Sequence, residues 1–220
     1  MTLPMSDELT LPYPHAETMR DHWWWRPGWR VGRRFYSIFA TFERDDALHE
    51  LIDTYQSALA PVSGLTMIPR QWRHLTIQGV GFVDEITPAE LDAIVAAVGE
   101  RLATMDTSEQ GFGPLSVHQE ALVLPAIPQE PLVAIKAAIR AGIASAIGSD
   151  RLDGPVDGFR PHVTVAYNDR DRDSDDVLTE LAQLEVASVP IPIRTVQILE
   201  VDRDERMYRW RYVRTIRLAM

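Results

Sequence analysis

A four-residue pattern of histidine, apolar residue, threonine and apolar residue occurs twice in the chain. It reads His-Leu-Thr-Ile at 74–77 and His-Val-Thr-Val at 162–165. Both copies lie in segments rich in β-branched and aromatic residues, which are typical of strands. Because residues two apart in a strand share a face, each histidine projects beside its threonine while the apolar residues point into the opposite layer. The pattern therefore predicts two related strands, each presenting an imidazole next to a hydroxyl.

The elements expected around these strands repeat in the order strand, helix, strand, helix. The first half has strands at 33–43 and 65–82, the second of them interrupted near Pro69, and helices at 45–60 and 88–105. The second half has strands at 114–127 and 159–168 and helices at 131–147 and 175–184. A last segment, from residue 189 to residue 219, reads as two strands joined at 202–205. Thr87, Pro88 and Glu90 form an N-terminal capping signal for the second helix. The order predicts an α+β fold with mostly antiparallel sheets and an internal duplication.

Composition narrows the class of protein. Of the 220 residues, 45% are hydrophobic and 25% are charged, which is typical of a globular chain. The longest apolar runs are far shorter than the ~20 residues of a membrane-spanning helix, so we expect no membrane association and a cytoplasmic location. The absence of cysteine excludes disulfides and thiolate chemistry. A net charge of −10 argues against binding of duplex DNA through its phosphates.

The paired pattern fits phosphodiester chemistry without a metal ion or cofactor. If the two strands lie side by side, two imidazoles and two hydroxyls converge. One neutral imidazole can take a proton from an attacking hydroxyl or water, and the other, as imidazolium, can protonate the leaving oxygen. The threonine hydroxyls can donate to the non-bridging oxygens, where negative charge gathers. The alternative is ordinary strand packing, which explains a single His-x-Thr well but two matched copies poorly.

At these residues the sequence resembles the 2H phosphoesterase superfamily, particularly its 2′-5′ RNA ligase-like and RNA 2′,3′-cyclic phosphodiesterase branch. The resemblance covers roughly residues 33–218. It implies two pseudo-symmetric lobes, each an antiparallel sheet with flanking helices, and an active-site cleft between them. It also implies that His74 and His162 are the acid and base and that Thr76 and Thr164 bind phosphate. Residues 1–32 would form an irregular arm rich in tryptophan and arginine, before a bilobal domain at 33–220.

Three further residues are candidates for substrate binding. Arg160 precedes His162 by two positions and so shares its strand face, whereas Arg73 should point away from His74. Tyr167 lies in the strand of the second motif, and Trp25 belongs to the cluster at 22–30, which could stack on bases but more often covers a core or cleft. The remaining histidines, at 15, 22, 49 and 118, lack the threonine, and we expect packing or surface roles for them.

Two classes of function follow. The first is a metal-independent hydrolase, probed with nucleoside 2′,3′-cyclic phosphates, that acts on a cyclic phosphate or 2′-5′ linkage of RNA ends or nucleotides; a cyclic nucleotide messenger is an alternative substrate. The second is a non-catalytic protein, binding nucleotide or RNA on the same scaffold. Both intact motifs favour the enzyme, which we expect to be a monomer.

Overall fold

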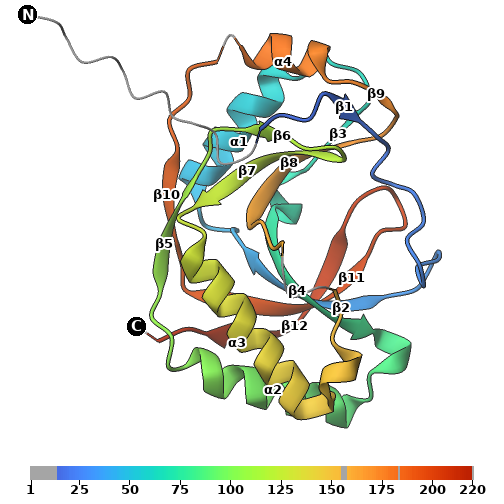
Figure 1. Cartoon of the computed structure of the whole chain (residues 1–220), viewed down its shortest axis with the longest axis vertical. Coiled ribbons are helices and arrows are strands. Elements are labelled where there is room, and N and C mark those ends of the chain that lie inside the picture. Colours follow the sequence, from blue (N-terminus) through green and yellow to red (C-terminus); the bar gives the residue numbers. More distant parts are fainter. Residues whose placement is uncertain (1–13, 155–157, 183, 220) are drawn as a thin grey trace, which may run out of the picture.

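The computed structural model describes residues 14–154, 158–182 and 184–219, and in this part of the chain helices surround two larger antiparallel sheets (Figure 1). The α-helices are α1 (Asp46–Ala58), α2 (Pro88–Leu102), α3 (Glu130–Ile147) and α4 (Asp175–Leu181). The α+β class is therefore confirmed. None of the described helices is long and apolar enough to cross a membrane.

The first sheet has four strands in the order β12-β11-β2-β4, all antiparallel. These strands span Arg209–Arg217 (β12), Thr195–Asp202 (β11), Phe35–Thr41 (β2) and His74–Phe82 (β4). The sheet thus joins the expected C-terminal hairpin to strands of the first half of the chain. The first motif lies at the start of β4, an edge strand of this sheet.

The second sheet has the order β10-β5-β7-β8-β3, and β6 also pairs with β7. Its strands span Val189–Ile193 (β10), Ser108–Phe112 (β5), Ser116–Val117 (β6), Ala121–Ile127 (β7), His162–Asn168 (β8) and Leu65–Met67 (β3). Because β3 pairs only with the end of β8, from Ala166 to Asn168, it leaves the second motif uncovered on that side. Strand β8 lies against β4 of the first sheet.

Three strand expectations were wrong in detail. The expected strand 114–127 is two strands, β6 and β7, separated by a turn at 118–120. The expected first C-terminal strand is divided into β10 and β11, which belong to different sheets. Pro190 and Pro192 explain this division, because proline cannot donate a ladder hydrogen bond and is tolerated in β10 at the sheet edge. Strand β5 was not predicted, since its sequence, Ser-Glu-Gln-Gly-Phe, has little strand character.

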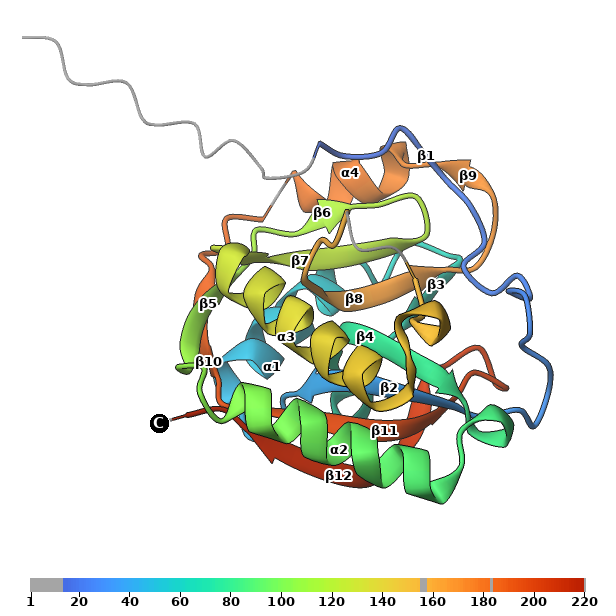
Figure 2. The ribbon, with the colours of Figure 1, turned by 60° about the horizontal axis from the view of Figure 1, so that its bottom comes forward.

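The two lobes exchange helices. Helix α1 follows β2 of the first sheet but packs against β8 and β10 of the second. Helix α3 follows β7 of the second sheet but packs against β4 and α2 (Figures 1 and 2). Each half of the chain therefore contributes to both lobes, so the sequence duplication does not divide the molecule into two independent halves.

Local signals in the sequence position α2 as expected. The Thr87 hydroxyl accepts a hydrogen bond from the Glu90 amide at 3.2 Å, and the Glu90 carboxylate accepts one from the Thr87 amide at 2.8 Å. This reciprocal capping satisfies donors that a helix N-terminus leaves unpaired. The predicted start of this helix is confirmed.

The apolar residues of both motifs lie in the main core. Leu75 and Ile77 of β4 and Val163 and Val165 of β8 are at most 1% exposed. They belong to one hydrophobic cluster that extends through both lobes. Burial of these side chains fixes the face on which each motif histidine and threonine must project.

The arm that precedes β2 follows one side of the molecule (Figure 2). Its two-residue strand β1 (Thr18–Met19) pairs with β9 (Arg172–Asp173), and Arg33 forms an ion pair with Asp84 at 2.8 Å. Residues 1–13 of the expected arm lie outside the described residues. We retain the boundary between an arm at 1–32 and a bilobal domain at 33–220 as a prediction.

Candidate active site

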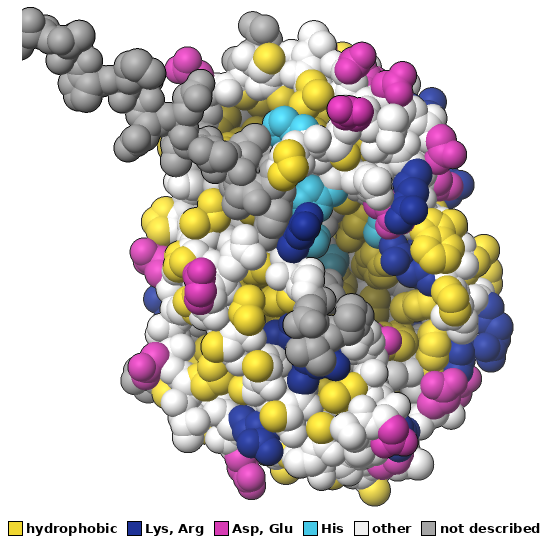
Figure 3. Space-filling model, viewed as in Figure 1, with side chains coloured by type: hydrophobic (Ala, Val, Ile, Leu, Met, Phe, Trp, Pro, Cys, Tyr) yellow, Lys and Arg dark blue, Asp and Glu magenta, His cyan; other side chains and the backbone are white. Residues whose placement is uncertain are grey.

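Both motifs line a single cavity between the two sheets. His74 and Thr76 reach it from β4, and His162 and Thr164 reach it from β8. The cavity has a volume of about 740 Å³. Figure 3 shows histidine side chains inside the hollow, next to hydrophobic side chains on its walls. The side-by-side placement expected from the sequence is thus present in the structure.

Both motif strands carry a register shift at the same place. On β4, Thr76 pairs with Phe39 and Gln78 with Ile38, so Ile77 is an extra residue. The same shift occurs on β8, where Val165 is the extra residue between Thr164 and Ala166. A bulge of this kind changes which later residues face a given side. The fifth residue after each motif histidine, Gly79 on β4 and Tyr167 on β8, therefore lines the cavity.

The two motif imidazoles are held in the same way. Nδ1 of His74 lies 2.8 Å from the carbonyl oxygen of Trp72, and Nδ1 of His162 lies 2.6 Å from that of Arg160. A carbonyl oxygen only accepts, so Nδ1 is the donor in both rings. In the neutral form of each ring, Nε2 then carries the lone pair. Each ring thus keeps one nitrogen able to accept a proton, which is the requirement for a general base.

His74 is the more deeply buried of the two. The residue is only 6% exposed, and its ring stacks on Phe39 with centroids 4.2 Å apart and planes at 12°. Burial lowers the pKa of His74 to about 4, although the hydrogen bond to Trp72 opposes the shift. Burial also lowers the pKa of the partly exposed His162. Burial therefore holds both rings toward the neutral form.

A third histidine, His118, lines the same cavity. Its ring centroid lies 5.8 Å from that of His162, with the planes at 66°. Burial, followed by the charges of His162 and Arg160, lowers the pKa of His118 to about 4. Sequence reasoning missed this residue because it lacks the motif threonine and sits in a turn. The structure places it directly after β6, which pairs with β7, and β7 in turn pairs with β8, the strand of the second motif.

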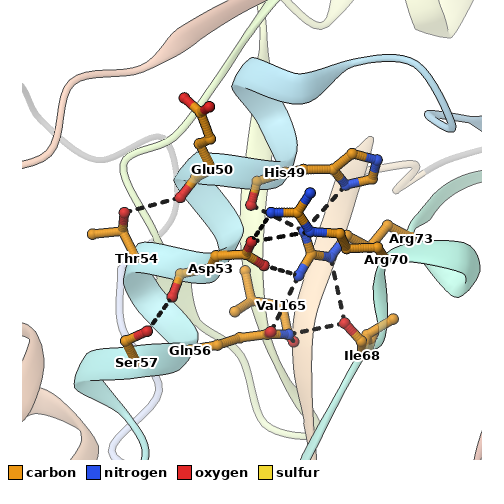
Figure 4. A network of polar contacts seen from close by, with 10 residues as sticks. All are labelled: His49, Glu50, Asp53, Thr54, Gln56, Ser57, Ile68, Arg70, Arg73 and Val165. Carbon is orange, nitrogen blue, oxygen red and sulfur yellow. Dashed lines mark hydrogen bonds and ion pairs between the residues drawn. The ribbon is translucent and has the colours of Figure 1, made fainter.

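A polar network behind the cavity ties the two motif strands together (Figure 4). Arg73, next to His74, is 2% exposed, forms an ion pair with Asp53 of α1, and donates to the His49 carbonyl oxygen at 3.0 Å. It also donates to Gln56 at 3.2 Å, and Gln56 donates to the carbonyl oxygen of Val165 at 2.9 Å. Helix α1 thus connects the residue before the first histidine to the bulge after the second threonine. Arg73 points away from the cavity, as strand alternation predicts.

Side chains of the arm cover part of the cavity by binding Glu120, which also lines it. This carboxylate binds Arg20 at 2.9 Å, Trp24 at 3.2 Å and Arg26 at 2.7 Å, and it lies 3.3 Å from Nδ1 of His22. Burial alone would raise the pKa of Glu120, but the contact with His22, the hydrogen bond from Trp24 and the charge of Arg26 lower it to about 2. Glu120 is therefore ionised near neutral pH, and four arm side chains converge on it.

The other candidates occupy different positions. Tyr167 lines the cavity and is 4% exposed, and burial raises the pKa of its hydroxyl. The side chain of Arg160 is exposed, and the contact it makes with His162 is through its backbone carbonyl. Trp25 is 50% exposed and is not among the described residues that line the cavity. In its place, the arm contributes Trp29, with Arg26, Pro27 and His22, to the wall.

The described residues include no group of three or more His, Asp or Glu side chains arranged to hold a metal ion. Four histidines do line the cavity, His22, His74, His118 and His162, but two of them, His74 and His162, direct Nδ1 to backbone carbonyls. The donors gathered here are thus imidazoles and hydroxyls, which suit proton transfer and hydrogen bonding to an anion.

Residues 44–205, which include both motifs, match the family profile of the 2′-5′ RNA ligase superfamily. The chain belongs to this superfamily of 2H phosphoesterases. The resemblance expected from the two motifs is thereby confirmed. No curated protein sequence matches this chain significantly.

Solved structures of the superfamily share the fold at low sequence identity. TT0787 of Thermus thermophilus is 16% identical, with a TM-score of 0.61 over 84% of this chain and 97% of its own. E. coli LigT in its apo form is 12% identical, with a TM-score of 0.62 over 86% of this chain and 99% of its own. LigT has also been solved with NADP⁺, at 12% identity and a TM-score of 0.61 over the same shares of the two chains. A further LigT complex, with 3′-AMP, is 13% identical and has a TM-score of 0.58 over the same shares.

Proposed function

We propose that this protein is a metal-independent phosphodiesterase that hydrolyses a 2′,3′-cyclic phosphate or a 2′-5′ linkage of an RNA end or nucleotide. The observation that carries the proposal is the matched pair of imidazoles. Each donates from Nδ1 to a backbone carbonyl, keeps Nε2 for proton transfer, and stands beside a threonine in one cavity. Membership of the superfamily and the nucleotide complexes of LigT support the substrate class.

We infer the roles of the two histidines from their burial. We propose His74 as the base, because its low pKa keeps Nε2 unprotonated near neutral pH. In opening a cyclic phosphate, His74 takes a proton from water as the water oxygen bonds to phosphorus. The bond from phosphorus to the 2′ or 3′ oxygen breaks, and protonated His162 gives its proton to that oxygen.

His162 must be protonated for this step, although burial lowers its pKa in the free protein. A bound phosphodiester supplies the missing negative charge, and an anion beside an imidazole raises the imidazole pKa. Substrate binding therefore prepares the acid. Thr76 and Thr164 donate to the non-bridging oxygens, where charge develops.

His118 adds a third imidazole to this arrangement. We propose that it hydrogen-bonds the phosphate or the leaving oxygen next to His162, since the two rings are 5.8 Å apart. Burial and the charges of His162 and Arg160 lower the pKa of His118 to about 4, so in the free protein its ring is neutral near pH 7. This proposal replaces the expectation of a packing role.

Turnover of nucleoside 2′,3′-cyclic phosphates in the presence of EDTA tests the function. We expect hydrolysis with a bell-shaped pH profile, because one imidazole must be neutral and the other protonated. Thr76→Val and Thr164→Val should each reduce turnover less than loss of a motif histidine, because each removes only one hydrogen bond. Saturable nucleotide binding without any product would instead indicate a non-catalytic binding protein.

The setting of the protein is also a proposal. We propose a cytoplasmic monomer, supported by the globular composition and the absence of cysteine. Size-exclusion chromatography with light scattering measures the oligomeric state directly. A stable dimer at micromolar concentration would contradict it.

A further inference from the structure

The two lobes differ at one pair of equivalent positions in the cavity. Gly79 and Tyr167 are each the fifth residue after a motif histidine, and both follow the bulge. On the Tyr167 side, the space is filled by a ring that stacks on His22 at 4.1 Å and contacts Tyr208 at 5.6 Å. On the Gly79 side, there is no side chain. The glycine therefore leaves room for another group to approach the backbone on its side of the cavity, whereas packed rings fill the space on the other lobe.

Aromatic rings form the wall beyond Gly79. Trp29 stacks on Phe35 with centroids 5.6 Å apart, and Phe82 meets Phe35 edge to face at 4.9 Å. All three rings line the cavity and are partly exposed. Aromatic faces of this kind are where nucleobases stack, and a stacked base typically contributes about 1–3 kcal/mol.

A carboxylate stands directly over Gly79. A Cβ atom added to Gly79 would lie 2.0 Å from Oδ2 of Asp153 and 3.0 Å from Phe35, so only glycine permits this approach. The backbone of Asp153 is held firmly, because its carbonyl oxygen accepts from Gln78 at 2.7 Å and from Arg140 at 2.8 Å. Within the described ranges, the carboxylate itself has neither a hydrogen-bond nor an ion-pair partner, and it faces the cavity.

The distance along the strand from Thr76 to Gly79, where the carboxylate lies, matches the distance from the phosphate to the base in a nucleotide. Thr76 pairs with Phe39 and Gly79 pairs with Ser37, so the two positions are separated by two residues of β2. At the usual rise of a strand, this is about 7 Å. A phosphate on the 2′ and 3′ oxygens of ribose lies at roughly this distance from the base. A second phosphate would be repelled by Asp153, so the position suits a base better than an extended RNA backbone.

We propose that the space bounded by Gly79, Asp153, Phe35 and Trp29 is a base-binding subsite that prefers guanine. The inference rests on the proposed function for the phosphate end of the cavity. Guanine is the base that carries two adjacent N–H donors, at N1 and N2, on one edge, and both can bind a carboxylate. Adenine and cytosine offer one amino group beside an acceptor nitrogen, and uracil offers one N–H between two carbonyls. Each of these would place a lone pair against Asp153.

The test compares the full-length protein with Asp153→Asn, Gly79→Ala and the control Asp150→Asn. Asp150 is exposed in the same segment and does not line the described cavity. For the unaltered protein, kcat/KM should be roughly 10- to 100-fold higher for guanosine 2′,3′-cyclic phosphate than for the 2′,3′-cyclic phosphates of adenosine, cytidine and uridine. Asp153→Asn should remove this preference. Gly79→Ala should also remove it, because the new methyl group displaces the carboxylate, while Asp150→Asn should retain it.

Equal kcat/KM for the four bases, or a guanosine preference that survives Asp153→Asn, would overturn the subsite while leaving the phosphodiesterase proposal intact. If the protein hydrolyses none of the cyclic phosphates, calorimetric titration with 2′-GMP and 2′-UMP still tests the subsite separately from the enzyme activity. Tighter binding of 2′-GMP that depends on Asp153, without hydrolysis of any substrate, would support the subsite and refute the enzyme. Binding of neither nucleotide, together with no turnover, would refute both.

Discussion

Replacement of His74 by glutamine should make the fold less sensitive to acid. In the folded protein, burial lowers the pKa of His74 from 6.5 to about 4, so between these two pH values the unfolded chain binds a proton that the folded protein does not. The free energy of unfolding must then decrease as pH falls through this window. The stability contribution is fully present above pH 6.5 and is lost by about pH 4.

The size of the effect follows from the shift. Each pKa unit corresponds to 1.36 kcal/mol, so the buried imidazole accounts for about 3 kcal/mol of acid sensitivity. His74→Gln has no titrating group at this position. Between pH 7 and pH 4 the free energy of unfolding should decrease in both proteins. The decrease should be about 3 kcal/mol smaller for His74→Gln than for the unaltered protein. His118, whose pKa is also lowered to about 4, is present in both proteins and cancels in the comparison.

Urea unfolding followed by fluorescence and circular dichroism at several pH values measures this difference, provided that the two probes give coincident transitions. Buffers must be free of phosphate, since a bound anion would raise the pKa of the ring. An NMR titration of the His74 ring protons gives the pKa independently. An identical pH dependence of stability in both proteins, or a ring pKa near 6.5, would refute both the burial argument and the assignment of His74 as base.

Four further outcomes are expected. His74→Ala and His162→Ala should each lower turnover by about 10²- to 10⁴-fold, and the double variant should lose much less than the product of the two losses; steady-state kinetics on folded variants measures this. Hydrolysis should persist in EDTA, and activity that is lost on chelation and restored by a divalent ion would exclude the two-histidine mechanism. His118→Ala should lower kcat about tenfold or more, whereas Gln119→Ala, its exposed neighbour outside the described cavity wall, should not; equal activities would return His118 to a packing role. Glu120→Gln should weaken the contacts that hold the arm and speed limited trypsin cleavage within it, and an unchanged cleavage rate would show that the arm is held by its aromatic packing instead.

The turn between β6 and β7 contacts residues that are distant in sequence. His118 and Glu120 lie two residues apart in the turn between β6 and β7. One reaches the cavity beside His162, and the other binds four side chains of the arm. No local pattern marks this turn, because both roles depend on partners more than 40 residues away along the chain.

The repeated tetrapeptide was sufficient by itself to predict two related strands and the faces on which His74, Thr76, His162 and Thr164 project. The physical reason is local: alternation along a strand is set by covalent geometry, and the buried Leu75 and Val163 fix which face turns inward. The capping box of α2 was predictable for the same reason, since its donors and acceptors are neighbours in sequence.

Only the tertiary structure decided what surrounds the motif residues. The exchange of α1 and α3 between lobes, the division of the C-terminal segment between two sheets, and the arrival of His118 beside His162 all depend on packing between residues far apart in the chain. The bulges at Ile77 and Val165, the last residues of the two motifs, turn Gly79 and Tyr167 toward the cavity, contrary to simple alternation. Alternation within a strand is a property of the backbone, but pairing register and cavity shape are properties of the whole fold, and those set the burial, and hence the pKa, of each histidine.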